Sequence, residues 1–144
     1  MSILFLDIDG VLNSIATRPQ DPSGLSAWLD PRNVCHLAEI VRVANPDIVV
    51  TSSWRLSNEL GDLASQLAKA GCKANVIAAT PFLDSHRRAI EIQAWLDEAD
   101  PRPEKFAILE DEQEMEHLAP FLVKTSKLHG LALEHVEKVL ALLR

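Results

Sequence analysis

Short apolar runs alternate with longer helical patterns along the chain, and this alternation constrains the fold more than any other feature of the sequence. Five runs have the length and composition of buried strands, over residues 3–6, 48–50, 74–78, 106–109 and 122–125. Four helical patterns lie between or after them, one beginning at Asp30-Pro31 and others over 54–70, 85–99 and 131–143. Strands that alternate with helices pair in parallel through right-handed crossovers. The sequence therefore predicts a three-layer, Rossmann-like α/β fold around a parallel five-stranded sheet.

One long connection interrupts this alternation, over residues 13–29, which are rich in Pro, Ser and Gly. The chain has 144 residues, of which 47% are hydrophobic and 24% charged, as is usual for one globular domain. We therefore expect a single domain over 1–144. Residues 13–29 are too few to fold independently, so they should form a short flap and not a separate cap domain.

Charge and hydropathy limit the partners of this chain. The formal charge of −7 argues against broad, non-specific nucleic-acid binding, which needs a basic face, but it is compatible with recognition of one phosphorylated end. No apolar run approaches the ~20 residues that span a bilayer, so no membrane partner is expected. Acidic residues interrupt the first apolar stretch, and no basic segment precedes it, which argues against a signal peptide and favours the cytoplasm.

The segment FLDIDGVLN over residues 5–13 carries the strongest chemical signal. Asp7 and Asp9 follow a buried strand, where carboxylates are costly unless they are paired or bound to a metal ion. Gly10 suits a backbone that bends closely around a ligand. The alternative interpretation is a loop with two solvated acids.

Other polar residues follow neighbouring strands. The segment TSSWR begins at Thr51, where hydroxyl and N–H groups at a helix N-terminus would form an anion site, although Ser52 is also an ordinary N-cap residue. Glu110 and Asp111 follow the fourth strand. Ligands of parallel α/β sheets bind beyond the carboxyl ends of the strands, so these groups should meet at one edge.

In this order, the motifs resemble those of the haloacid dehalogenase (HAD) superfamily, and the FLDIDGVLN segment resembles its nucleophile motif almost letter for letter. The SSWR sequence, Thr80-Pro81 after the third strand and Gly130-Leu131 before the last helix narrow the resemblance. Together they look like the small capless HAD domain of Swiss Army Knife RNA repair proteins. In the superfamily, caps enter after the first or third strand, and here both connections are short.

The resemblance implies roles for the acids. Asp7 would attack phosphorus and form an aspartyl phosphate, while Asp9 would protonate the leaving oxygen and later activate water. The carboxylates of Asp7 and Asp111 and the carbonyl of Asp9 would bind Mg²⁺, which prefers oxygen ligands. Glu110 stands where the superfamily more often has Asp, and it would contact the metal ligands without binding the ion directly.

The resemblance also implies phosphate-binding groups. Thr51, with Ser52 beside it, would hold a phosphoryl oxygen. A cation would lie near the start of the helix before the fourth strand, where Arg88 is preferred and Arg87 is the substitute, although both arginines are also compatible with plain solvation.

These features predict a Mg²⁺-dependent phosphomonoester hydrolase, acting on a phosphorylated substrate such as a nucleotide or a nucleic-acid end. Arg55 would support the site or reach the substrate, and Trp28 would either stack on a base or pack. The alternative is a non-catalytic phosphate-binding or interaction module that keeps the fold, against which the intact Asp7 and Asp9 speak. A receiver domain is disfavoured because no acid ends the third strand.

Overall fold

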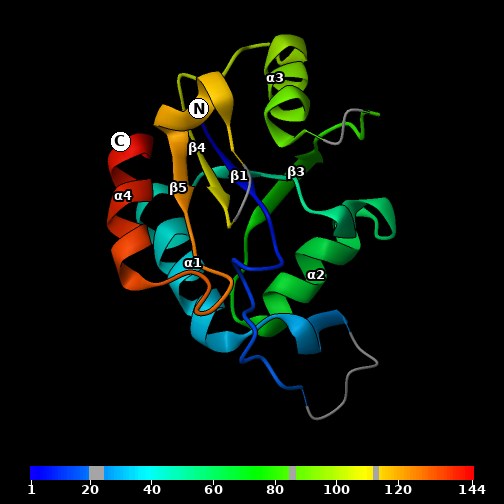
Figure 1. The fold of residues 1–144 in the computed structure, drawn as a ribbon, viewed down its shortest axis with the longest axis vertical. Coiled ribbons are helices and arrows are strands. Elements are labelled where there is room, and N and C mark those ends of the chain that lie inside the picture. The colour runs from blue at the N-terminus through cyan, green and yellow to red at the C-terminus, as the bar shows by residue number, and fades with distance from the viewer. Residues whose placement is uncertain (20–24, 85–86, 112–113) are drawn as a thin grey trace.

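A five-stranded parallel sheet forms the centre of the computed structural model, which describes residues 1–19, 25–84, 87–111 and 114–144 (Figure 1). The strands are β1 (Ser2–Leu6), β2 (Asp47–Val50), β3 (Asn75–Ala79), β4 (Lys105–Glu110) and β5 (Leu122–Lys124). Their order in the sheet is β3-β2-β1-β4-β5, and all four neighbouring pairs are parallel. The central position of β1 places the residues that follow it, Asp7 onward, in the middle of the carboxyl edge.

Helices cover both faces of the sheet and make three layers (Figure 1). Three α-helices lie on one face: α1 (Pro31–Ala44), α2 (Leu60–Ala70) and α4 (Leu133–Leu143). The other face carries α3 (Arg88–Glu98) and the 3₁₀ helix η3 (Glu116–Phe121). Two further single-turn 3₁₀ helices are η1 (Leu25–Trp28) and η2 (Ser53–Leu56).

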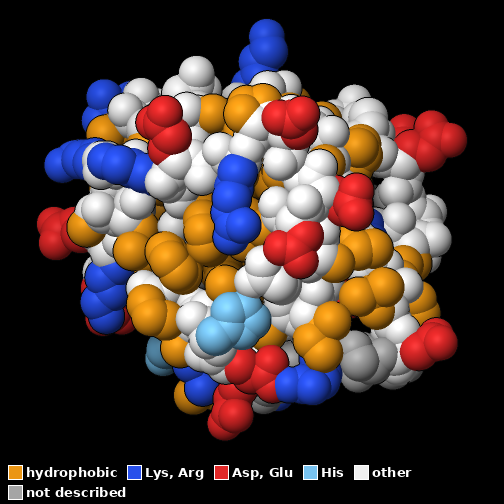
Figure 2. All heavy atoms as spheres, turned by 90° about the horizontal axis from the view of Figure 1, so that it is seen from above, with side chains coloured by type: hydrophobic (Ala, Val, Ile, Leu, Met, Phe, Trp, Pro, Cys, Tyr) orange, Lys and Arg blue, Asp and Glu red, His pale blue; other side chains and the backbone are white. Residues whose placement is uncertain are grey.

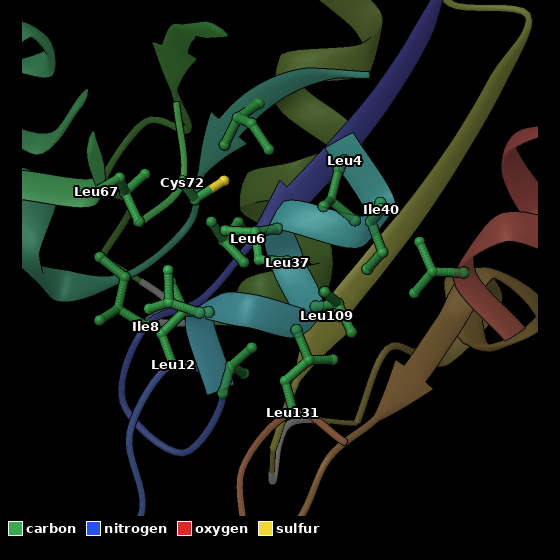
Figure 3. Close-up of a cluster of buried hydrophobic side chains, with 14 of the residues drawn as sticks. Leu4, Leu6, Ile8, Leu12, Leu37, Ile40, Leu67, Cys72, Leu109 and Leu131 are labelled. Atoms are coloured by element: carbon green, nitrogen blue, oxygen red, sulfur yellow. The ribbon is translucent and has the colours of Figure 1, made fainter. Parts of the chain in front are cut away.

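Alternation along β1 explains why both faces need cover. Leu4 and Leu6 point into the larger apolar cluster, where Figure 3 shows them beside Leu37 and Ile40 of α1. The intervening Ile3 and Phe5 lie in the second cluster, with α3. Successive side chains of a strand point to opposite faces, so a strand that is apolar at every position is stable only between two layers.

The predicted fold class is confirmed, and the strand boundaries differ from the predicted ones by one residue at most. The predicted helix over 54–70 is wrong at its start, because η2 ends at Leu56 and α2 begins only at Leu60. The side-chain amide of Asn58 donates to the carbonyl of Trp54 at 2.9 Å and so replaces a helical N–H at that carbonyl.

The connections that could hold a cap contain little regular structure in the described part of the chain. Between β1 and α1 the described residues form only the single turn η1. Residues 20–24 of the predicted flap, and Ser85 at the predicted start of the third helix, lie outside the described residues. Within the described ranges, no helix combines the length and the apolar character that crossing a membrane requires.

Candidate active site

Three carboxylates converge at the carboxyl edge of the sheet, beyond β1 and β4. Oxygen atoms of Asp7, Glu110 and Asp111 lie within 4.8 Å of one another. Asp7 and Glu110 are buried, whereas Asp111 is partly exposed. One Glu110 oxygen accepts the backbone N–H of Asp111 at 3.0 Å, which orders the turn after β4. Asp7 and Asp111, two of the residues predicted to bind a metal ion, therefore lie close together, and Glu110 belongs to the same cluster.

Crowding perturbs this cluster electrostatically. Burial raises the pKa of Asp7, although contacts with Glu110 and Arg88 oppose this effect. Burial and the adjacent Asp7 and Asp111 raise the pKa of Glu110 to about 10. Three acids held this closely need a positive counter-charge to be ionised together. Because all the available donors are hard carboxylate oxygens, the residues fit Mg²⁺.

Asp9 differs from Asp7 in being exposed, at the mouth of the site. Its carboxylate accepts the Nδ2–H of Asn13 at 2.9 Å and the indole N–H of Trp54 at 3.3 Å. The Oδ1 atom of Asn13 in turn accepts the backbone N–H of Gly10 at 2.9 Å. Asp9 is therefore held in place by two side chains while it remains open to solvent. The sequence alone predicts no role for Asn13 and does not predict this contact of Trp54.

Gly10 is required by its surroundings. Its φ of +80° lies in the left-handed region, and a Cβ atom built there would be 2.2 Å from Oδ2 of Asp111. The carbonyl of Gly10 accepts the hydroxyl of Thr125 at 2.7 Å, which ties this turn to the end of β5. The missing side chain lets Asp111 approach the loop that carries Asp7 and Asp9.

Thr51 and Ser52 follow β2, and both are buried, but their hydroxyl groups differ in use. The Thr51 hydroxyl has no hydrogen-bond partner among the residues described, while its backbone N–H continues the sheet by donating to Leu6 at 2.9 Å. The Ser52 hydroxyl accepts the N–H of Trp54 at 3.2 Å, as an N-cap of η2. Of these two hydroxyls, that of Thr51 is the one without a partner in the described part of the chain, as is the buried hydroxyl of Thr80 after β3. The helix that follows Thr51 is a single 3₁₀ turn and not the predicted long helix.

Three arginines have distinct surroundings. Arg88 lies between two buried carboxylates, with its Nε 3.5 Å from Glu110 and its Nη1 3.4 Å from Glu91. Arg87, the preceding residue, forms an exposed ion pair with Glu116 of η3. Of the two, Arg88 is thus the one beside the carboxylate cluster.

Arg55 is engaged by the protein itself. Its guanidinium donates to the carbonyls of Thr51 at 2.7 Å, Ser52 at 2.9 Å and Thr80 at 2.9 Å, and its side chain is only 2% exposed. This geometry makes Arg55 a brace that joins the ends of β2 and β3, and direct contact with a substrate does not fit it.

An open cavity of about 360 Å³ adjoins the carboxylates. Its walls come from the segment after β1, from η1, and from the turns after β4 and β5: Asp9, Gly10, Asn13, Ser14, Ile15, Trp28, Asp111 and Lys127. Trp28 is therefore at the site, partly exposed and on the same cavity as Asp9.

Comparison with known proteins agrees with this arrangement. Neither the search of curated proteins nor that of solved structures produced a match. Residues 3–136 match a protein-family profile described as the HAD domain in Swiss Army Knife RNA repair proteins. The matched range includes all five strands, except Ser2 at the start of β1, and all three residues of the carboxylate cluster. The chain therefore belongs to the HAD domain family of Swiss Army Knife RNA repair proteins.

Proposed function

We propose that this HAD domain is a Mg²⁺-dependent phosphomonoester hydrolase that forms an aspartyl phosphate on Asp7. The observation that carries the proposal is the meeting of Asp7, Glu110 and Asp111 beside Arg88, with Asp9 held at the mouth of the same site. A purely structural trio of acids would pay a large desolvation cost without a compensating ligand.

The two aspartates would divide the chemistry. A carboxylate oxygen of Asp7 attacks phosphorus, and the bond between phosphorus and the leaving oxygen breaks as Asp9 gives that oxygen its proton. Asp9, now ionised, takes a proton from a water molecule whose oxygen attacks the same phosphorus. Inorganic phosphate leaves, and Asp7 is restored as a carboxylate.

Neighbouring groups would bind the phosphoryl group. The buried hydroxyl of Thr51, which lacks a protein partner in the described residues, would donate to a phosphoryl oxygen. Arg88 would offset negative charge, which is the usual task of a cation at a phosphoryl-transfer site. The brace formed by Arg55 would keep Thr51 in position.

Asp7 and Asp111 would hold Mg²⁺, with Glu110 beside them and, as the family resemblance implies, the carbonyl of Asp9 as a further ligand. When bound, the metal ion supplies positive charge at the phosphoryl oxygens. Burial and the neighbouring carboxylates raise the pKa of Glu110, so a cation bound at the cluster would favour its ionised form.

The proposed substrates are nucleotides or phosphorylated nucleic-acid ends, with support from the family description. The net charge of −7 disfavours long contacts with a nucleic-acid backbone. On the face shown in Figure 2, basic side chains stand apart and are interspersed with acidic and apolar ones, so that face presents no continuous basic surface. Both observations favour recognition of one phosphorylated end over broad binding.

The test uses the purified full chain with a panel of phosphomonoesters, in Mg²⁺ and in EDTA. Asp7→Asn should abolish turnover and retain the native circular dichroism spectrum, and Asp9→Asn should be severely slowed. Asp62→Asn, at an exposed position of α2, is the matched control and should retain activity. Acid-quenched wild-type protein should carry a phosphoryl group on the peptide that contains Asp7. Near-normal activity of Asp7→Asn in Mg²⁺ would overturn the proposal, and a well-folded but wholly inactive wild type would favour a phosphate-binding module.

A further inference from the structure

Two large apolar side chains are exposed on the cavity beside Asp9. Trp28 is 39% exposed and Ile15 is 55% exposed, and both line its wall. Scattered exposed apolar residues are ordinary, but a pair on the wall of a cavity next to the proposed proton donor is the usual character of a ligand site. The volume of about 360 Å³ is also in the range of small-molecule sites.

The main chain of Trp28 is tied to the catalytic turn on both sides. The Nδ2 group of Asn13 donates to the Trp28 carbonyl at 3.0 Å and to the Asp9 carboxylate at 2.9 Å. Two residues further on, the N–H of Asp30 donates to the Leu12 carbonyl at 2.8 Å. Between these anchors, Leu29 is buried in the main apolar cluster. The main chain that carries Trp28 is thus fixed beside Asp9.

The remaining walls add polar groups. Ser14 and Lys127 also line the cavity, and the backbone N–H of Ile15 donates to the carbonyl of Lys127 at 2.9 Å, which joins the two loops. A flat apolar surface with a hydroxyl and a cation nearby matches a molecule that has an aromatic ring, hydroxyl groups and negative charge. Nucleotides have this combination, because every base offers a face for stacking.

We propose that this cavity is the leaving-group subsite and that it binds the nucleoside part of a phosphorylated nucleotide, with the base stacked on Trp28. The inference rests on the proposed function, since the leaving oxygen must lie beside the proton donor Asp9. Trp28 is then a specificity-determining residue. The same chemistry is offered by a free mononucleotide and by the terminal nucleotide of an oligonucleotide.

The experiment compares substrates with and without a base. We expect kcat/KM of the wild type to be about tenfold or more higher for nucleoside monophosphates than for ribose 5-phosphate. Trp28→Ala should remove most of that difference, with little change for ribose 5-phosphate, and Trp28→Phe should restore much of it. Assays with 3′- and 5′-phosphorylated oligonucleotides distinguish the two sources. If the natural ligand is the terminal nucleotide of a polymer, mononucleotides should be poor substrates compared with the oligonucleotides. If it is a free mononucleotide, they should not.

Phe82 provides the matched control. It is 52% exposed and lies on a different cavity at the same edge, with Arg88 and Leu56. Phe82→Ala should leave the preference for a base unchanged. Two results would overturn the subsite. In the first, Trp28→Ala lowers kcat/KM equally for substrates with and without a base. In the second, Phe82→Ala, and not Trp28→Ala, selectively lowers kcat/KM for substrates with a base.

Binding of the unphosphorylated nucleoside tests the subsite without any turnover. Titration followed by NMR should give a dissociation constant that Trp28→Ala raises about tenfold and that Asp7→Asn leaves nearly unchanged. If this binding is found but no phosphomonoester is hydrolysed, the hydrolase proposal fails alone. If ribose 5-phosphate is hydrolysed and nucleosides do not bind, the subsite fails alone.

Discussion

Glu91 and Arg55 form an ion pair at 3.2 Å whose two side chains are almost completely withdrawn from solvent, at 1% and 2% exposure. The other oxygen of the Glu91 carboxylate lies 3.4 Å from Arg88, and Arg88 in turn reaches Glu110. Glu91, on α3, thus contacts both Arg55, which holds the Thr51 loop, and Arg88, which lies beside the carboxylate cluster. Phosphate binding at this site should depend on a residue that does not touch phosphate.

Glu91→Gln tests that dependence. The amide keeps an acceptor for the N–H of Leu83, which donates to Glu91 at 2.9 Å, but it leaves Arg55 as a buried charge without its counter-ion. We expect the free energy of unfolding to fall by about 3–5 kcal/mol in urea titrations. The matched control is Glu39→Gln, which removes the partner of Arg42 in an exposed pair and should change stability little. Equal effects of the two substitutions would contradict the importance of burial.

Gly10→Ala should displace Asp111. The added methyl group would need space that Oδ2 of Asp111 occupies, and the backbone would be strained at φ +80°. We expect loss of Mg²⁺-dependent activity and a lower melting temperature. Gly61→Ala is the control, because a Cβ atom there meets nothing within 4 Å and the position is helical, so this variant should be stabilised by about 0.5–1 kcal/mol. A fully active Gly10→Ala protein would show that Asp111 is dispensable.

Metal binding should be visible as thermal stabilisation. A ligand at a hundredfold excess over its Kd stabilises the folded state by ~2.7 kcal/mol, so Mg²⁺ should raise the melting temperature above that in EDTA. Asp111→Asn should lose most of this increase, and without metal it should be at least as stable as the wild type, because one charge leaves a crowded cluster. Glu114→Gln, at an exposed position, should respond to Mg²⁺ like the wild type. The same increase in Asp111→Asn would exclude Asp111 as a ligand.

We expect His135 to lower the free energy of unfolding at acidic pH, independently of the active site. Its Nδ1 atom accepts the N–H of Ala132 at 2.9 Å and so caps α4, which requires an unprotonated nitrogen. Burial lowers the pKa of His135, and Lys138 and His36 act in the same direction against Glu134.

As the pH falls below about 6.5, His135 takes up a proton in the unfolded chain but not in the folded one. The contribution of His135 to the free energy of unfolding is therefore fully present above that pH and decreases below it. Urea titrations at pH 7.5 and 5.5 measure this decline. His135→Gln keeps an acceptor but cannot titrate, and its stability should depend less on pH across this interval. An unchanged dependence would assign the effect to other groups.

The strands and their parallel pairing could be predicted because apolar runs and their alternation with helices are visible in the local sequence. A continuous apolar run such as residues 3–6 fixes both its own buried state and the need for two covering layers. The start of α2 could not be predicted, because the hydrogen bond from Asn58 to Trp54 competes with helix geometry only once the chain has turned. Helical periodicity carries no trace of that contact.

In the candidate site, too, some features follow from the local sequence and others depend on contacts that form only in the folded chain. The acids after β1 and β4 follow from strand ends, whereas the roles of Asn13 and Trp54 depend on contacts with Asp9 across 4 and 45 residues. Adjacent arginines of the same chemistry also look alike in a sequence. The fold separates them, since Arg87 points to Glu116 and Arg88 to Glu110.

Two hydrogen bonds close the segment between Leu12 and Asp30 and make it a suitable place for insertions. The Asn13–Trp28 and Leu12–Asp30 contacts hold the two ends of the segment together at a neck, so residues inserted between Arg18 and Ala27 could leave Asp9 in place, together with Ser14 and Ile15 of the cavity wall. Each doubling of a flexible loop costs only ~0.6 kcal/mol of closure entropy. The neck is accordingly a natural point for grafting, where a lineage or a designer could add a lid or a new recognition element and leave the phosphate chemistry as it is.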